Sequence, residues 1–208
     1  NGIPRRASDL VGEINAVMFG AHDLDLVLGP PSLRRRYLDI LISQLDHHYL
    51  RTMQRYQRVI VQRNHLLKSV RGGRSQPDEL GFWDDELVET GKYIMARRAR
   101  TIKDLSEKAA PIHGDLSGNG EVLELAYRLS VETPQDDSED EMALSLRDAL
   151  AENRPRELAQ GFTALGPHRD DVTVRLDGME AGPYASRGQC RTAVLAMKLA
   201  EAGSLSDE

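Results

Sequence analysis

The strongest constraint on the fold is a pair of long helical patterns separated by one short break. The first pattern places apolar side chains at spacings of four, three, four and seven residues, at Tyr49, Met53, Tyr56, Ile60 and Leu67. The second covers residues 83–116, with Pro111 expected to kink or split it. Between the patterns, Gly72-Gly73-Arg-Ser-Gln-Pro77 is a strong helix break. Such spacings align apolar side chains on one helix face, so the sequence predicts two antiparallel helices that form an arm.

Charged residues occur in blocks of one sign. Between Asp46 and Asp78 there are seven Lys and Arg residues and no carboxylate, and residues 90–103 carry five more without an acid. Residues 115–157 hold twelve carboxylates against four arginines, including an acidic run at 136–141 that we expect to be a solvated loop. The formal net charge of −6 over 208 residues is therefore an average that describes neither the basic segments nor the acidic one. It does not exclude nucleic acid as a partner.

Composition narrows the class of protein. With 29% charged and 5% aromatic residues the chain favours helices, and no apolar run approaches the roughly 20 residues that a membrane-spanning helix needs. The single Cys190 cannot form an internal disulfide, which fits a reducing compartment and a cytoplasmic location. We expect no metal site, because His47, His48 and His65 lack partners at metal-ligand spacing.

The remaining segments predict a mixed α/β fold that is mainly helical. We divide the chain into residues 1–31, a strand and an entry segment; 32–161, the helical arm with one edge strand; and 162–208, a β-hairpin and a final helix. Within these, we expect helices at 32–44 (capped by Ser32), 142–152 and 188–202, and a short helix that ends at Gly161. We expect strands at 123–131, 162–165 and 172–176, and a turn at Asp177-Gly178.

A candidate anion site precedes the final, buried helix. Tyr184-Ala-Ser186-Arg-Gly188-Gln189 offers a serine hydroxyl and the backbone N–H groups of a helix start. An ordinary serine N-cap is the alternative. A nucleophile elbow is excluded because Tyr184 occupies the position of its first glycine.

Arginines supply a candidate nucleic-acid surface. They are Arg34, Arg35, Arg36, Arg51, Arg55 and Arg58. Such residues bind phosphate backbones by counterion release, and the alternative is a solvated face that offsets the acidic segment. His168-Arg169-Asp170 begins like a protein-kinase catalytic loop, but Arg175 occupies the position of the required Asn and the chain has no Asp-Phe-Gly. A salt-bridged turn is the alternative for this segment.

Taken in order, these segments resemble RecF recombination proteins. The resemblance is carried by residues 17–39 (Val17-Met-Phe19 to Leu38-Asp39), by Gln62-Arg63-Asn64 and Trp83-Asp84 in the arm, and by Gly166-Pro-His-Arg-Asp-Asp171 and Tyr184-Ala-Ser-Arg-Gly-Gln-Cys-Arg-Thr-Ala193 near the end. It covers essentially the whole chain.

The resemblance implies a particular part of an ATP-binding-cassette (ABC) ATPase, similar to the heads of Rad50 and SMC proteins. This part is the lobe II region, with a Q-loop-like entry in residues 1–31 and a signature-motif helix after Ser186. In such ATPases the signature of one head completes the nucleotide site of the other. By resemblance, Ser186, Arg187, Gly188 and Gln189 would face the γ-phosphate of ATP in trans, with Arg187 at the signature's first glycine position.

The resemblance also implies a parent protein that is a weak DNA-dependent ATPase. It would use ATP and Mg²⁺, form an ATP-dependent homodimer, bind single-stranded DNA and gapped or single-/double-strand junctions, and act with RecR and RecO in DNA replication, repair, recombination and the SOS response.

The sequence lacks two parts of a complete ATPase. It contains neither a Gly-x-x-x-x-Gly-Lys-Ser/Thr loop nor an apolar run ending in Asp-Asp or Asp-Glu. We therefore expect a middle segment without catalytic residues that, alone, neither binds ATP tightly nor hydrolyses it. The alternatives are a helical scaffold arm for protein partners and another SMC-like ATPase. The 166–171 motif and the short arm favour RecF.

Overall fold

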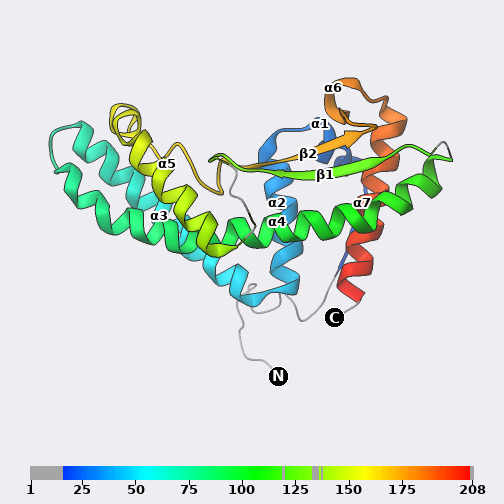
Figure 1. Cartoon of the computed structure of the whole chain (residues 1–208), viewed down its shortest axis with the longest axis horizontal. Coiled ribbons are helices and arrows are strands. Elements are labelled where there is room, and N and C mark those ends of the chain that lie inside the picture. Colours follow the sequence, from blue (N-terminus) through cyan, green and yellow to red (C-terminus); the bar gives the residue numbers. More distant parts are fainter. Residues whose placement is uncertain (1–15, 119, 133–135, 137, 207–208) are drawn as a thin grey trace. The chain divides into compact units, whose positions relative to one another are not determined.

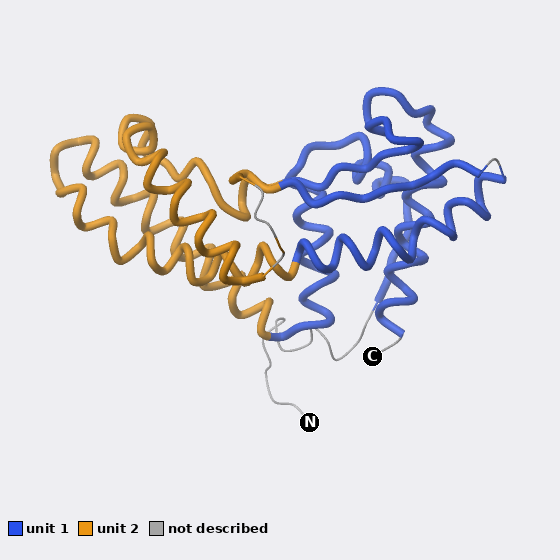
Figure 2. The backbone as a smooth tube through the Cα atoms, viewed as in Figure 1, with its two compact units in different colours: residues 1–47, 98–128, 171–208 blue, residues 48–97, 129–170 orange. Residues whose placement is uncertain are grey.

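The computed structural model describes residues 16–118, 120–132, 136 and 138–206 (Figure 1). These residues form mainly helices and one small sheet, which confirms the predicted mixed α/β class. The chain divides into two compact units (Figure 2): unit 1 comprises residues 1–47, 98–128 and 171–208, and unit 2 comprises residues 48–97 and 129–170. No helix among the described residues is long and apolar enough to cross a membrane.

Unit 2 is built on the two predicted arm helices. These are α3 (His47–Arg71) and α4 (Gly81–Ser117), which continues into unit 1; a short 3-10 helix, η3 (Pro77–Leu80), precedes α4. Three contacts run in opposite chain directions along α3 and α4: His48 with Tyr93, Arg55 with Glu86, and Arg63 with Asp84. The helices are therefore antiparallel, as predicted. Their apolar stripes build the core, with Tyr49, Tyr56, Leu67, Leu87 and Ile94 at most 2% exposed.

The third helix of unit 2 differs from its prediction. α5 (Glu139–Gln160) is one helix instead of two, it includes Pro155, and it ends at Gly161 in the left-handed conformation (φ 76°). Part of the acidic run is also its first turn and not a loop, because Ser138 caps the helix and carboxylates are favourable near a helix N-terminus. Residues 133–135 and 137 lie outside the described residues.

Unit 1 contains a three-stranded antiparallel sheet of β1 (Leu123–Arg128), β2 (Asp171–Leu176) and β3 (Met179–Glu180), in that order. The predicted edge strand β1 pairs with β2, so that Leu123 faces Leu176 and Leu125 faces Val174. Directly opposite apolar side chains stabilise such a pair. The predicted turn between β2 and β3 is present, with φ values of 50° at Asp177 and 78° at Gly178.

Helices cover this sheet and carry the candidate site. α2 (Pro31–Leu45) packs against both β2 and α7 (Arg187–Ser206). It begins one residue before its predicted cap Ser32, with Pro31 in the first turn, where proline is favourable. Three short helices complete unit 1: η2 (Ala21–Leu24), α1 (Asp25–Leu28) and α6 (Ala181–Tyr184).

Two further expectations differ from the structure. Of the kink or split expected at Pro111, the split does not occur: α4 continues through Pro111 as one helix, since Ala109 and His113 on either side are fully buried and their packing offsets one missing hydrogen bond. Residues 162–165 are not a strand: Asn64 accepts the N–H of Thr163, and Glu157 accepts the N–H of Ala164. Side chains therefore take the donors that a strand partner would need. The strand expected within 1–31 is absent from residues 16–31, and residues 1–15 lie outside the described residues.

Candidate functional site

The predicted signature segment forms the start of α7. Ser186 lies just before the helix, where its Oγ accepts a hydrogen bond from the backbone N–H of Gln189 (3.2 Å). In return, Oε1 of Gln189 accepts the backbone N–H of Ser186 (2.8 Å). This reciprocal pair is a capping box, which fixes the backbone at the helix start. The structure thus brings the four predicted signature residues together at one helix end.

This helix start is exposed although its helix is buried. Ser186, Arg187 and Gly188 are exposed and Gln189 is half-buried, whereas Cys190, Ala193 and Val194 just below them are at most 1% exposed. Burial raises the pKa of the Cys190 thiol, so it stays protonated at neutral pH. The apolar part of α7 anchors a polar end that faces outward.

The donors of this end suit an anion. The first turn of a helix leaves backbone N–H groups without intrahelical partners, here those of Arg187 and Gly188. The Ser186 hydroxyl accepts from Gln189 and can still donate its own hydrogen. The helix dipole and the exposed guanidinium of Arg187 add positive potential. The segment can therefore bind a phosphate that approaches from outside.

The arginines predicted to bind DNA fall into two groups. In unit 1, Arg34 makes a bidentate ion pair with Asp171 (2.7 and 2.9 Å) and donates to the carbonyl oxygen of Gly29 (2.8 Å). It therefore joins α2 to the start of β2. Its neighbour Arg35 is half-buried, and Arg36 is exposed.

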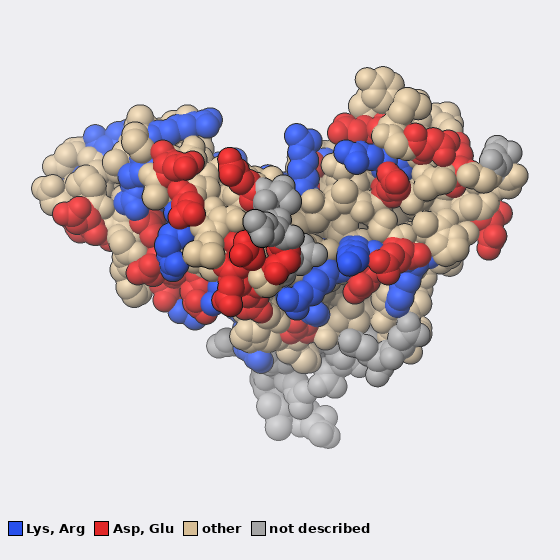
Figure 3. All heavy atoms as spheres, in the orientation of Figure 1, with Lys and Arg blue, Asp and Glu red and all other residues tan. Residues whose placement is uncertain are grey.

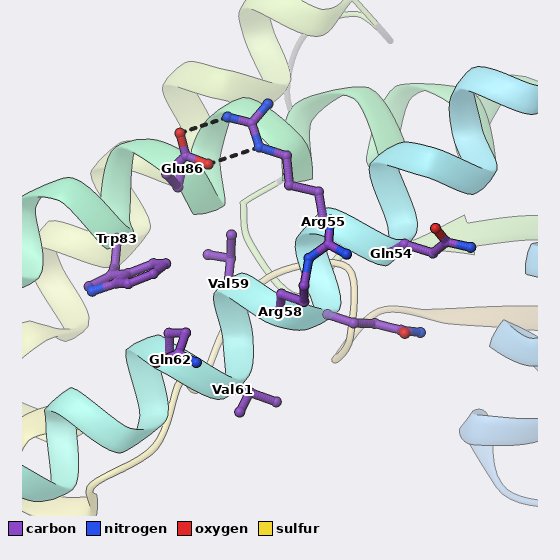
Figure 4. Close-up of a pocket in the computed structure, with 9 residues that line it drawn as sticks. Gln54, Arg55, Arg58, Val59, Val61, Gln62, Trp83 and Glu86 are labelled. Carbon is purple, nitrogen blue, oxygen red and sulfur yellow. Dashed lines mark hydrogen bonds and ion pairs between the residues drawn. The ribbon is translucent and has the colours of Figure 1, made fainter.

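In unit 2, Arg51, Arg55 and Arg58 are all exposed on α3. Arg55 makes a bidentate ion pair with Glu86 of α4 (2.9 and 2.7 Å). Arg55 and Arg58 border an open groove of about 720 Å³ between α3 and α4 (Figure 4). The groove is also lined by Gln54, Gln57, Val59, Val61, Gln62, Trp83 and Glu86. We call this surface the arm groove.

The charge blocks of the sequence are not kept apart on the face shown in Figure 3. On that face, each unit carries Lys and Arg atoms as well as Asp and Glu atoms. Two of the arm's positive charges are even internal: Arg63 is 0% exposed, and Arg98, which pairs with Asp39 (2.7 Å), is 2% exposed. A count of charges along the sequence therefore overstates the basic surface.

Arg63 lies in a buried network that the sequence did not reveal. Its guanidinium donates to Asp84 (2.8 Å), Glu157 (2.6 Å) and the Thr163 hydroxyl (2.8 Å). Asp84 also pairs with Arg154. These partners lie 21, 94 and 100 residues from Arg63 in the chain, so no local spacing could have identified them.

The segment 166–171 has a structural role in both units. In unit 2, His168 Nδ1 lies 2.6 Å from the Tyr56 hydroxyl, Arg169 stacks on Phe162, and Asp170 accepts the N–H of Ser130. In unit 1, Asp171 pairs with Arg34. The turn is present, and Asp170 and Asp171 each interact with a residue outside it. Gly166 (φ 116°) is required because a Cβ there would lie 2.8 Å from the Tyr56 hydroxyl oxygen.

Sequence comparison shows which known proteins the chain is similar to. No family model matches it. It is 44% identical over 204 residues to the DNA replication and repair protein RecF of Chloroflexus aurantiacus, covering 96% of this chain and 52% of that protein. It is 45% identical over 203 residues to RecF of Chloroflexus aggregans (96% and 52%), and 42% identical over 205 residues to RecF of Synechocystis (95% and 53%). The chain thus spans about half the length of the curated relatives that it matches.

Solved structures agree with these relatives. The chain is similar to the recombination mediator protein RecF-ATPrS in the RecFOR pathway, with a TM-score of 0.92 and 29% identity over 98% of this chain and 54% of the other. For RecF-ATP the TM-score is 0.90, with 30% identity over 96% and 53%. Both comparisons place the chain among proteins named RecF and match about half of each of them. The resemblance to RecF is therefore confirmed: the chain corresponds to a segment of RecF proteins.

Proposed function

We propose that this chain is the signature-bearing segment of a RecF-like, ATP-dependent DNA-binding protein. The observation that carries the proposal is the exposed, capped start of α7, which lies in a fold shared with RecF-ATP. ATP would lie between two heads of a homodimer, with Ser186, Arg187, Gly188 and Gln189 acting in trans. When bound, ATP supplies the anionic γ-phosphate that these residues face.

Each residue has a definable task in this proposal. The N–H groups of Arg187 and Gly188 and the hydroxyl of Ser186 would donate hydrogen bonds to phosphate oxygens, and the Arg187 guanidinium would balance charge. Because the capping box fixes these donors before the partner arrives, their ordering costs little at the moment of binding.

The proposal does not assign Mg²⁺ to this segment. Among the described residues, no group of three or more His, Cys, Asp and Glu side chains could hold a metal ion.

The wider cellular role is proposed from the relatives. We infer that the parent acts in recombinational repair and replication restart at single-strand gaps, including the SOS response. It would bind single-stranded or gapped DNA in the cytoplasm and contact RecR and RecO. Exposed Arg36, Arg51 and Arg58 are the residues of this segment that remain best placed for phosphate contacts.

The proposal is tested by Ser186→Arg in the longer protein that carries this segment. A bulky side chain at the exposed helix start would block the approach of a second head. We expect ATP-dependent dimerisation, measured by analytical ultracentrifugation, to be lost while ATP binding by the monomer persists. Gly203→Arg is the matched control, because Gly203 is exposed at the other end of α7, where an added Cβ would meet no other part of the fold within 4 Å. Normal dimerisation of Ser186→Arg would overturn the trans role.

A further inference from the structure

A chain of hydrogen bonds joins the start of α7 to the last turns of α4 within unit 1. The side-chain nitrogen Nε2 of Gln189 donates to Oε1 of Glu121. The other carboxylate oxygen of Glu121 lies 3.2 Å from Nε2 of His113. His113 is a residue of α4 and is 0% exposed, while the Glu121 side chain is 15% exposed. The proposed signature is therefore linked through Glu121 to a buried residue, His113.

The carboxylate determines how the Gln189 amide is oriented. An ionised carboxylate only accepts hydrogen bonds, so the amide NH₂ must face Glu121. The amide oxygen then faces the N–H of Ser186, which donates to it at 2.8 Å. The opposite orientation would place two oxygens against each other and two donors together. Glu121 thus selects one of the two amide orientations.

The selected orientation suits an incoming anion. The amide NH₂ carries two hydrogens, of which one is directed to Glu121, and the second can be donated outward. The amide oxygen, which would repel a phosphate, is occupied by the Ser186 N–H. The same interaction also fixes the backbone at Ser186, whose hydroxyl belongs to the site.

His113 holds the carboxylate in place. Within the described part of the chain its Nδ1 is buried without a hydrogen-bond partner, whereas its Nε2 faces Glu121. The tautomer that fits carries its hydrogen on Nε2 and donates it to Glu121, since a buried N–H at Nδ1 would have no acceptor. The imidazole therefore fixes the one oxygen of Glu121 that Gln189 does not use.

We propose that Glu121 is a positioning residue for the signature: supported by His113, it orients the Gln189 amide so that the segment 186–189 presents donors, and not an acceptor, to the phosphate of a second head. This inference rests on the proposed trans role of the segment. It assigns to Glu121 and His113 a part in nucleotide-dependent assembly without direct contact with the nucleotide.

The test is Glu121→Gln, with Glu124→Gln as the matched control. Glutamine has the size of glutamate but can donate as well as accept, so it accommodates both orientations of Gln189. Glu124 is exposed on β1, and its substitution makes the same chemical change without a link to Gln189. In the 208-residue chain, we expect the Gln189 side-chain amide resonances to shift and the Ser186 N–H to exchange about tenfold faster in Glu121→Gln only.

In the longer protein, we expect Glu121→Gln to weaken ATP-dependent dimerisation about tenfold, as the loss of a hydrogen bond to a charged group would, with monomer ATP affinity and Tm unchanged. A parallel loss of Tm and dimerisation would indicate a merely structural role and overturn the proposal. Unchanged Gln189 resonances or unchanged dimerisation would also overturn it. If the unsubstituted protein does not dimerise with ATP, the proposed trans role fails. The resonances and the Ser186 exchange then still decide whether Glu121 orients Gln189.

Discussion

In unit 2 the guanidinium of Arg63 is completely buried between two carboxylates, whereas in unit 1 Arg187 is exposed at the start of α7. Both residues carry the same charge, but their surroundings give them different tasks. Arg63 has three side-chain acceptors and joins α3, α4 and α5. Arg187 lies beside helix donors that can meet a ligand. Burial and partners, and not residue type, separate an arginine that stabilises the fold from one that can bind.

The comparison predicts the largest effect for Arg63→Met. This substitution leaves Glu157, which is also 0% exposed, with an uncompensated negative charge. Loss of one partner from a buried ion pair typically costs about 3–5 kcal/mol. We expect a decrease of that size in the free energy of unfolding. It is measured by urea denaturation followed through Trp83, the only tryptophan, which lies next to Asp84 in unit 2.

Two further variants sharpen this prediction. Arg58→Met, on the exposed face of the same helix, is expected to change stability by less than about 0.5 kcal/mol. Glu157→Gln in the Arg63→Met background should restore part of the loss, because it removes the unpaired charge. If Arg63→Met is as stable as Arg58→Met, the buried network does not stabilise unit 2.

Much of the fold was predictable because its signals are local. The apolar stripes of α3 and α4, the glycine break between them, the alternation in β1 and β2, and the Asp177-Gly178 turn all depend on neighbours in sequence. The failures have a different origin. Thr163 and Ala164 do not form a strand because side chains from Asn64 and Glu157 take their N–H groups, and such tertiary competition leaves no local pattern.

The sequence predicted the motif of the candidate site, residues 186–189, but not the residues that hold it in place. The serine, glycine and glutamine of the segment 186–189 indicated a capped helix start, and the structure contains it. Sequence reasoning missed Glu121 and His113, which lie 68 and 76 residues before Gln189. It also could not show that Arg34, one of the DNA candidates, pairs with Asp171, which lies 137 residues away in the chain; a DNA contact of Arg34 stays a prediction.

The next effect concerns the exposed arginines of α3. We expect Arg51→Glu together with Arg58→Glu to weaken DNA binding about 10- to 100-fold and to lower the slope of log affinity against log salt by about 2, as two lost phosphate contacts would. Arg55 is left intact because it holds Glu86. The measurement is a salt titration by fluorescence anisotropy with labelled gapped DNA, in parallel with the intrinsic fluorescence of Trp83 in the arm groove.

A charge-matched control distinguishes the α3 surface around Arg51 and Arg58 from general electrostatics. Lys68→Glu with Arg74→Glu reverses two exposed charges near the other end of α3 and in the loop after it. If both double variants weaken DNA binding equally, the effect is one of net charge and not of that surface. A scaffold arm for protein partners predicts that neither variant changes DNA affinity.

The smallest effect is expected at Tyr37 in unit 1, which contrasts with Arg63 and its three side-chain acceptors. Among the described residues the buried Tyr37 hydroxyl makes no hydrogen bond of good geometry, although Glu201 lies close enough to raise its pKa both by its charge and as an acceptor. We therefore expect Tyr37→Phe to change stability at pH 7 by at most about 1 kcal/mol. Burial, followed by the charge of Glu201, raises the pKa of Tyr37 well above its usual value. In the unfolded chain this phenol ionises near pH 10, before it does so in the folded chain.

The raised pKa fixes the sign of the pH dependence. Below about pH 10, Tyr37 is protonated in both states and stability is fully retained; as the pH rises above about 10, ionisation of the unfolded chain lowers stability by up to about 1.4 kcal/mol per pH unit. Tyr37→Phe should remove this part of the alkaline loss, whereas Tyr184→Phe should not, because Tyr184 is 73% exposed. Thermal unfolding followed by circular dichroism between pH 8 and 11 compares the three proteins. If stability falls with pH in the same way for the original chain and Tyr37→Phe, the phenol ionises at the same pH in the folded and the unfolded chain. Tyr37 would then behave like the exposed Tyr184 and not like a buried group such as Arg63.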